Sequence, residues 1–125
     1  MGEVISSFRE LRVYKLAFEV QQEVFALTKS FPTEERFALT DQIRRASRSI
    51  GANISEAWHK RRYVAHFVSK LTDADGEQAE TQHWLCTSIA CGYLTEKQLQ
   101  GLLAKSMRIG QMLGTMISNP GKWCR

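Results

Sequence analysis

Residues 39–57 read LTDQIRRASRSIGANISEA, and the spacing of their apolar residues decides the fold. Apolar side chains recur at three- and four-residue intervals, which places them on one stripe of an α-helix with its turn of about 100° per residue. The strict alternation that is typical of a half-buried β-strand is missing. The predicted core stripe consists of Leu39, Ile43, Ala46, Ile50, Ile54 and Ala57.

The same period continues on both sides of this stretch, so the sequence predicts four helices, at about 8–31, 34–59, 63–91 and 95–118. Short connections force neighbouring helices to run in opposite directions. We therefore expect one domain, 1–125, that is all-α and folds as an antiparallel up-down-up-down four-helix bundle. The other predicted stripes are Val13, Ala17, Val20, Val24, Leu27 and Phe31; Phe67, Leu71, Ala74, Leu85 and Ile89 with the polar exception Gln78; and Leu99, Leu102, Ile109, Leu113 and Ile117.

Turn and capping residues set the expected helix boundaries. Pro32 ends the first helix, and Thr33 is expected to cap the second, since its hydroxyl is able to accept an N–H of the first turn. Gly92 suits a helix end that needs positive φ. Thr95 and Gln98 have the spacing of a capping box that begins the fourth helix.

Composition favours an ordinary globular domain. The 125 residues are 43% hydrophobic and 24% charged, and no apolar run approaches the roughly 20 residues of a membrane span. Residues 1–12 lack the apolar region of a secretory signal, so we expect a cytoplasmic protein without membrane contact. Cys86, Cys91 and Cys124 fit neither a redox pair nor a usual zinc spacing, and we expect small buried residues in a reducing compartment.

Charge is unevenly distributed, with +3 in residues 32–62 and −3 in residues 63–93. The arginines of the second helix lie off its core stripe and point outward, where they are suited to bind phosphates. In an antiparallel hairpin they also come level with the acidic residues of the third helix, and ion pairs within or between subunits explain the two segments without a ligand. The residues concerned are Arg44, Arg45 and Arg48 on one side and Asp73, Glu77 and Glu80 on the other.

The run Lys60-Arg61-Arg62 has no acidic residue within three positions and lies at the predicted turn between the second and third helices. Trp58, His59 and Tyr63 flank it, and cations beside aromatic rings suit nucleic-acid backbone binding with base stacking. A solvated turn is the alternative. Further cations of the fourth helix and the tail widen this surface if they share its side: Lys97, Lys105, Arg108, Lys122 and Arg125.

The first helix carries a second apolar stripe about 100° or more from its core line, formed by Leu11, Tyr14, Phe18 and Phe25. A wide face against two neighbouring helices is one explanation. An oligomer interface is the other, since contiguous exposed aromatic surface usually marks association.

No catalytic motif is present: the sequence lacks a P-loop, Gly-x-Gly-x-x-Gly, His-Glu-x-x-His and Gly-x-Ser-x-Gly. Two Glu-x-x-His spacings, at Glu56–His59 and Glu80–His83, are those of di-iron bundles. In the predicted hairpin they lie about 20 Å apart and are unable to share a metal. We therefore expect no catalytic residue, no cofactor, no metal and no small-molecule substrate.

The segment from Gln42 to Glu56, QIRRASRSIGANISE, resembles the four-helix-bundle proteins named after 23S ribosomal RNA intervening sequences. The opening at 8–14, FRELRVY, and the ADG at 74–76 with Glu80 and Trp84-Leu85 are similar to the same family. The residues that match the family motif are Arg44, Arg45, Asn53, Glu56 and Glu80; this chain has Ala57 where the family usually has Gly, and Glu77 where it usually has Ser.

The resemblance implies an antiparallel bundle that assembles into a ring-like homopentamer. It also implies an unsettled biochemical role, because some members are encoded within ribosomal RNA genes, whereas related accessory proteins of diversity-generating retroelements bind a reverse transcriptase and nucleic acid. We predict a non-enzymatic homo-oligomer that binds structured RNA or a nucleoprotein, mainly through Lys60, Arg61 and Arg62. The alternative is a protein-binding scaffold in which Arg44, Arg45 and Arg48 pair with acidic residues across subunits.

Overall fold

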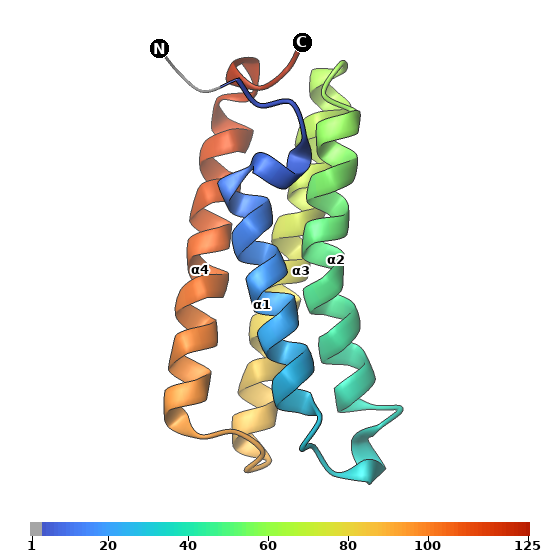
Figure 1. The fold of residues 1–125 in the computed structure, drawn as a ribbon, viewed down its shortest axis with the longest axis vertical. Helices are drawn as coiled ribbons and strands as arrows, with labels where there is room; N and C mark the ends of the chain where they lie inside the picture. The colour runs from blue at the N-terminus through green and yellow to red at the C-terminus, as the bar shows by residue number, and fades with distance from the viewer. Residues whose placement is uncertain (1–3) are drawn as a thin grey trace.

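Four long helices form an antiparallel bundle, and each helix packs against its neighbour in the chain while α1 also packs against α4 (Figure 1). The computed structural model describes residues 4–125, and residues 1–3 lie outside the described part of the chain. Helix α1 is Arg12–Thr28, α2 is Leu39–His59, α3 is Val64–Ala90 and α4 is Glu96–Ser118. Short 3₁₀ turns, η1 (Phe8–Glu10), η2 (Thr33–Glu35) and η3 (Pro120–Lys122), precede or follow the helices, and residues 4–125 contain no β-strand. The predicted all-α four-helix bundle is confirmed.

The core lies along the bundle axis and is made by the four predicted stripes. All six stripe residues of α2 are at most 5% exposed, and Gln78 is buried as well. Leu27, Ile89 and Ile117 are only partly buried, because Thr28, Ser88 and Met116 take the adjacent positions nearer the axis.

The first helix is shorter than the expected 8–31, because the chain breaks at Leu11. Ser7 and Glu10 form a capping box around η1, in which the Ser7 hydroxyl accepts the Arg9 N–H and the Glu10 carboxylate accepts the N–H groups of Ser6 and Ser7. These backbone hydrogen bonds lower the pKa of Glu10. Leu11 is extended (φ −65°, ψ 130°), and its side chain enters the core.

The second helix begins at Leu39, and the prediction that Thr33 caps it is wrong. Thr33 begins η2, and neither η2 nor α2 has a side-chain cap at its N-cap position. The Glu35 carboxylate accepts the Leu39 N–H (3.4 Å) and the Tyr93 hydroxyl (3.0 Å). The second hydrogen bond raises the pKa of Tyr93 to about 12.

The connection between α3 and α4 follows the predicted pattern. Gly92 has φ +79°, and the N–H of Tyr93 donates to the Ser88 carbonyl, which closes the end of α3. Thr95 and Gln98 form the predicted capping box at the start of α4.

Gln78 is the polar residue of the core, and Gly110 explains how it fits. Gln78 Nε2 donates to Asp75 Oδ1 (3.0 Å), and Gln78 Oε1 accepts from Gln82 Nε2 (2.7 Å). A Cβ at Gly110 on α4 lies 2.9 Å from Gln78 Nε2, so this glycine leaves room for the amide. Gly114, one turn further along α4, has open space around it.

The prediction that the cysteines are buried is wrong. Cys86 and Cys91 are exposed on α3 and just beyond it, and only Cys124 is partly buried, which raises the pKa of its thiol. Cys86 lies next to the stripe residue Leu85 but on the outer side of α3, and Cys91 is the C-cap residue of this helix. Within the described residues, every helix is too short or too polar to cross a membrane.

Candidate nucleic-acid interface

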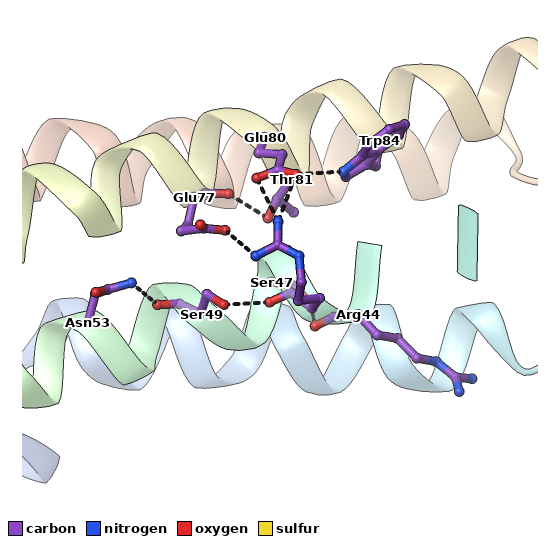
Figure 2. Close-up of polar contacts among 9 residues, drawn as sticks. Arg44, Ser47, Ser49, Asn53, Glu77, Glu80, Thr81 and Trp84 are labelled. Atoms are coloured by element: carbon purple, nitrogen blue, oxygen red, sulfur yellow. Dashed lines mark hydrogen bonds and ion pairs between the residues drawn. The ribbon is translucent and has the colours of Figure 1, made fainter. Parts of the chain in front are cut away.

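Arg45 on α2 forms ion pairs with two carboxylates of α3, those of Glu77 and Glu80, which Figure 2 labels. Its Nη2 donates to both oxygens of Glu80 at 2.8 Å, and its Nη1 lies 3.5 Å from Glu77 Oε2. The Trp84 indole N–H donates to the same Glu80 carboxylate (3.2 Å). The hydrogen bonds with Arg45 lower the pKa of Glu80, and Glu80 raises that of Arg45. The predicted ion pair therefore forms within one subunit.

Arg44 and Arg48 turn toward α1, away from these acids. Arg44 Nε donates to Thr28 Oγ1 (2.8 Å), and its guanidinium carbon lies 4.8 Å from the centroid of the Phe25 ring. The Arg48 guanidinium carbon lies 5.4 Å from the same ring. Figure 2 shows the Arg44 side chain extending away from Glu77 and Glu80. The expected pairing of Arg48 with the acidic stripe of its own subunit does not occur among the described residues, because its direction around the helix carries it toward α1.

Lys70 of α3 is a cation that the sequence analysis did not single out. Its Nζ lies 2.9 Å from Glu56 Oε2 and 3.7 Å from Asp73 Oδ2, and it donates to Asn53 Oδ1 (3.5 Å). The Lys70 hydrogen bond lowers the pKa of Glu56, and Glu56 raises that of Lys70. Lys70 is the only lysine or arginine of the acidic segment 63–93, and this isolated position is the signal that identifies it. Two family-motif residues of α2, Asn53 and Glu56, thus both contact Lys70 of α3.

The α2–α3 turn presents two of its three cations to solvent. Lys60 and Arg62 are exposed, whereas Arg61 is partly buried. Arg61 Nη1 donates to the Trp58 carbonyl (2.7 Å), and its guanidinium carbon lies 3.9 Å from the Trp58 ring centroid. Trp58 is 5% exposed and belongs to the core. The prediction that Arg61 and Trp58 offer a binding surface is therefore corrected: they hold the turn together.

The C-terminal tail adds cations at the same end. The Arg125 N–H donates to the Arg61 carbonyl (3.4 Å), and Figure 1 shows the C-terminus beside the end of the bundle that carries the α2–α3 turn. Within residues 4–125, no acidic side chain forms an ion pair with these cations. We call the exposed set Lys60, Arg62, Lys122 and Arg125 the basic end.

The remaining cations of α4 do not join this surface. Lys105 Nζ lies 2.8 Å from Glu19 Oε1 and also contacts Glu23 Oε1, and these carboxylates raise the pKa of Lys105. Lys97 lies in the first turn of α4, at the opposite end of the bundle. Arg108 lines a separate groove between α1 and α4.

The second apolar stripe of α1 is divided between several environments. Leu11 is 3% exposed and belongs to the core, so its assignment to an oligomer interface is wrong. Tyr14 and Phe18 stack with centroids 6.2 Å apart, and Phe18 is 46% exposed. Phe25 carries Arg44, Arg48 and Lys29 around its ring.

The two Glu-x-x-His spacings lie apart, with Glu56 paired to Lys70 and Glu80 to Arg45. His59, His66 and His83 are all exposed. Residues 4–125 contain no group of three His, Cys, Asp or Glu side chains placed to hold a metal ion.

Comparison with known proteins places these features in a family. A family model described as 23S rRNA-intervening sequence protein matches residues 9–115. A crystal structure of a protein of unknown function from the S23 ribosomal protein family of Bacteroides thetaiotaomicron is similar, with a TM-score of 0.78 and 32% sequence identity. The match covers 86% of this chain and 96% of the other. No curated protein matches the sequence.

Proposed function

Because this chain belongs to the family of 23S rRNA-intervening sequence proteins, we propose that it is a non-enzymatic homo-oligomer that binds structured RNA, alone or within a nucleoprotein. The observation that carries the proposal is the basic end. Two separate parts of the chain, the α2–α3 turn and the C-terminal tail, bring exposed cations together there without acidic partners among residues 4–125.

Unpaired cations on one surface suit a phosphate backbone. Binding releases the counterions condensed on the nucleic acid, so each cation adds most affinity at low salt. A cation already held by a carboxylate adds little, since binding then breaks the existing pair. Lys60 and Arg62 form no ion pair within residues 4–125, whereas Lys105 is held by the carboxylates of Glu19 and Glu23.

Self-association is supported by apolar side chains on the outside of the bundle. Phe18 and Met107 are about half exposed, and so are Tyr63 and Val64 at the α2–α3 turn. Such surface favours association. A homopentamer is the assembly that the resemblance implies.

The scaffold alternative loses one of its three arginines, since Arg45 pairs within its own subunit. Arg44 and Arg48 remain available to carboxylates of another chain. No specific contact favours that occupant over phosphate.

Fluorescence anisotropy of a labelled ribosomal RNA stem-loop at two salt concentrations tests the proposal. We expect salt-sensitive binding that a Lys60→Gln/Arg62→Gln variant weakens by about tenfold or more, with a salt slope shallower by about 1.8 for two lost phosphate contacts. Lys105→Gln is the matched control, because it removes a cation that is already paired. Absence of binding at low salt, or equal losses in the two variants, contradicts the proposal; light scattering checks the oligomeric mass of each variant.

A further inference from the structure

A second basic surface lies on the outer face of α2, near the end of the bundle opposite the basic end. It is a shallow groove of about 470 Å³, lined by four arginines, Arg36, Arg44, Arg45 and Arg48, and by one acidic residue, Asp41. We call it the arginine groove. Arg44 and Arg48 are one turn apart on the same row of the helix, so their guanidinium groups are neighbours along the groove.

The arginine groove keeps most of its positive charge. Among residues 4–125, only Arg45 of the four arginines forms an ion pair with a carboxylate. Arg36, Arg44 and Arg48 have no carboxylate partner in the part of the chain that the structure describes, and Asp41 offsets one of their charges. The arginine groove therefore carries a net positive charge, which suits an anionic ligand.

Two of these guanidinium groups are held in position before any ligand arrives. Thr28 Oγ1 accepts the Arg44 Nε–H, and the Thr28 hydroxyl itself donates to the Val24 carbonyl (2.8 Å). The Phe25 ring lies against both Arg44 and Arg48. Nε is thus occupied while the terminal nitrogens of Arg44 make no hydrogen bond to described residues. A guanidinium fork fixed in this way loses little entropy when it binds phosphate oxygens.

An exposed aromatic ring stands beside the same groove. Phe37, just before α2, is 85% exposed, and the guanidinium carbon of Arg36 lies 5.1 Å from its ring centroid. Exposed aromatic rings next to cations are the stacking platforms on which single-stranded nucleic acids place their bases. A duplex has no free base to place there.

We propose that the arginine groove binds an unpaired RNA segment, with backbone phosphates on Arg44 and Arg48 and a base stacked on Phe37. The inference rests on the proposed function, because it supposes an RNA partner. It adds the kind of RNA: a structured element recognised at the basic end, joined to a single strand that reaches the side of α2. Arg48 and Arg44 lie 12 and 16 residues before Lys60 on α2, which corresponds to about 18 and 24 Å along the helix axis.

Fluorescence anisotropy of a labelled single-stranded oligouridine, which forms no stable stem, tests the groove. The Arg44→Gln/Arg48→Gln variant is expected to bind about tenfold or more weakly, with a salt slope shallower by about 1.4 for two phosphate contacts on a single strand. Lys105→Gln is the matched control, because Lys105 is already paired and does not line the groove, and this variant is expected to bind within about twofold of the wild type. Phe37→Leu is expected to weaken binding roughly fivefold with little change of slope, since stacking releases no counterions.

A gain of affinity provides a second test that misfolding is unable to mimic. Asp41→Asn removes the carboxylate of the groove and is expected to tighten oligouridine binding about threefold at low salt. Helical content and unfolding midpoint are measured for every variant.

The outcomes separate this inference from the proposed function. Loss of oligouridine binding in the groove variant, with stem-loop binding lost only in Lys60→Gln/Arg62→Gln, supports both. Unchanged oligouridine binding in the groove variant overturns the groove and leaves the proposed function standing if the stem-loop still needs the basic end. A groove variant with reduced oligomeric mass and unchanged oligouridine binding means that carboxylates of a second copy occupy the groove, and this also overturns the inference.

Discussion

The two sides of α2 hold neighbouring arginines in different ways. On the side that faces α3, Arg45 is bound by carboxylates, and its side chain remains 47% exposed. On the side that faces α1, Arg44 is bound by a hydroxyl group and an aromatic ring. The two residues are adjacent in sequence but about 100° apart around the helix, so they meet different neighbours.

The difference teaches that a fixed cation need not be a neutralised one. A carboxylate holds Arg45 and also cancels its charge. A ring face and a hydroxyl hold Arg44 and leave the charge intact, because both partners are uncharged. Arg45 therefore contributes to the packing of α2 against α3, whereas Arg44 keeps a positive charge that suits an anionic ligand.

The largest loss of stability is expected from removing the Phe25 ring, which holds Arg44 and Arg48 on the α1 side of α2. Phe25→Ala deletes a partly buried ring together with its contacts to Arg44 and Arg48, so we expect a loss of about 1–2 kcal/mol in the free energy of unfolding. Urea denaturation measures it. Phe18→Ala is the control, because this ring is exposed and no cation of the described residues lies over it, and this variant is expected to lose less than about 0.5 kcal/mol. Equal losses in the two variants would show that the cations add nothing to Phe25.

A smaller loss of stability is expected from removing the Thr28 hydroxyl, which accepts the Arg44 Nε–H. Thr28→Val keeps the shape of the side chain but deletes the acceptor of the Arg44 Nε–H, so we expect a loss of about 1 kcal/mol. In nitrogen-15 spectra of arginine side chains, the Arg44 Nε–H is expected to exchange slowly with solvent in the wild type and rapidly in the variant. Ser49→Ala is the control, because the Ser49 hydroxyl bonds only the Arg45 carbonyl. An Arg44 Nε–H that exchanges rapidly already in the wild type contradicts the idea of a guanidinium fixed in advance.

The sequence predicted one side of α2 better than the other, and geometry explains why. An antiparallel hairpin with a known turn fixes which residues of α2 and α3 lie level, and this was enough to pair Arg45 with the stripe of Glu77 and Glu80. It does not fix which neighbouring helix an outward side chain turns toward. Arg48 was expected to face α3 and instead lies against the Phe25 ring of α1.

Local interactions explain the other differences between expectation and structure. Helical periodicity continued through Leu11, but the Ser7–Glu10 capping box begins a separate short turn, η1, and Leu11 after it is extended with its side chain in the core. A run of three cations suggested one surface, yet Arg61 folds back on the Trp58 ring. The C-terminal tail lies beside Lys60 and Arg62 because the Arg125 N–H donates to the Arg61 carbonyl. Helical periodicity does not predict such a contact between the tail and a turn.

The smallest loss of stability is expected from acid, which protonates Glu80 and weakens its ion pair with Arg45 on the α3 side of α2. Arg45 lowers the pKa of Glu80 below its ordinary value of 4.5. A carboxylate with a lowered pKa in the folded state stabilises the fold above its unfolded pKa, and this contribution is lost as the pH falls through the folded pKa. Because the Arg45 side chain is about half exposed and solvent screens the pair, we expect it to be worth only ~0.5 kcal/mol.

The comparison of Arg45→Gln with Arg44→Gln isolates this contribution. At neutral pH, Arg45→Gln is expected to lose the ~0.5 kcal/mol of the pair, and the difference from the wild type should disappear in acid and shrink in concentrated salt. Arg44→Gln is expected to show a difference from the wild type that does not depend on the protonation of Glu80, because Arg44 has no carboxylate partner among the described residues. Urea denaturation at neutral and acidic pH measures both. If the two variants respond to acid alike, the charge of Arg44 is also neutralised by a carboxylate, and the contrast between the two sides of α2 fails.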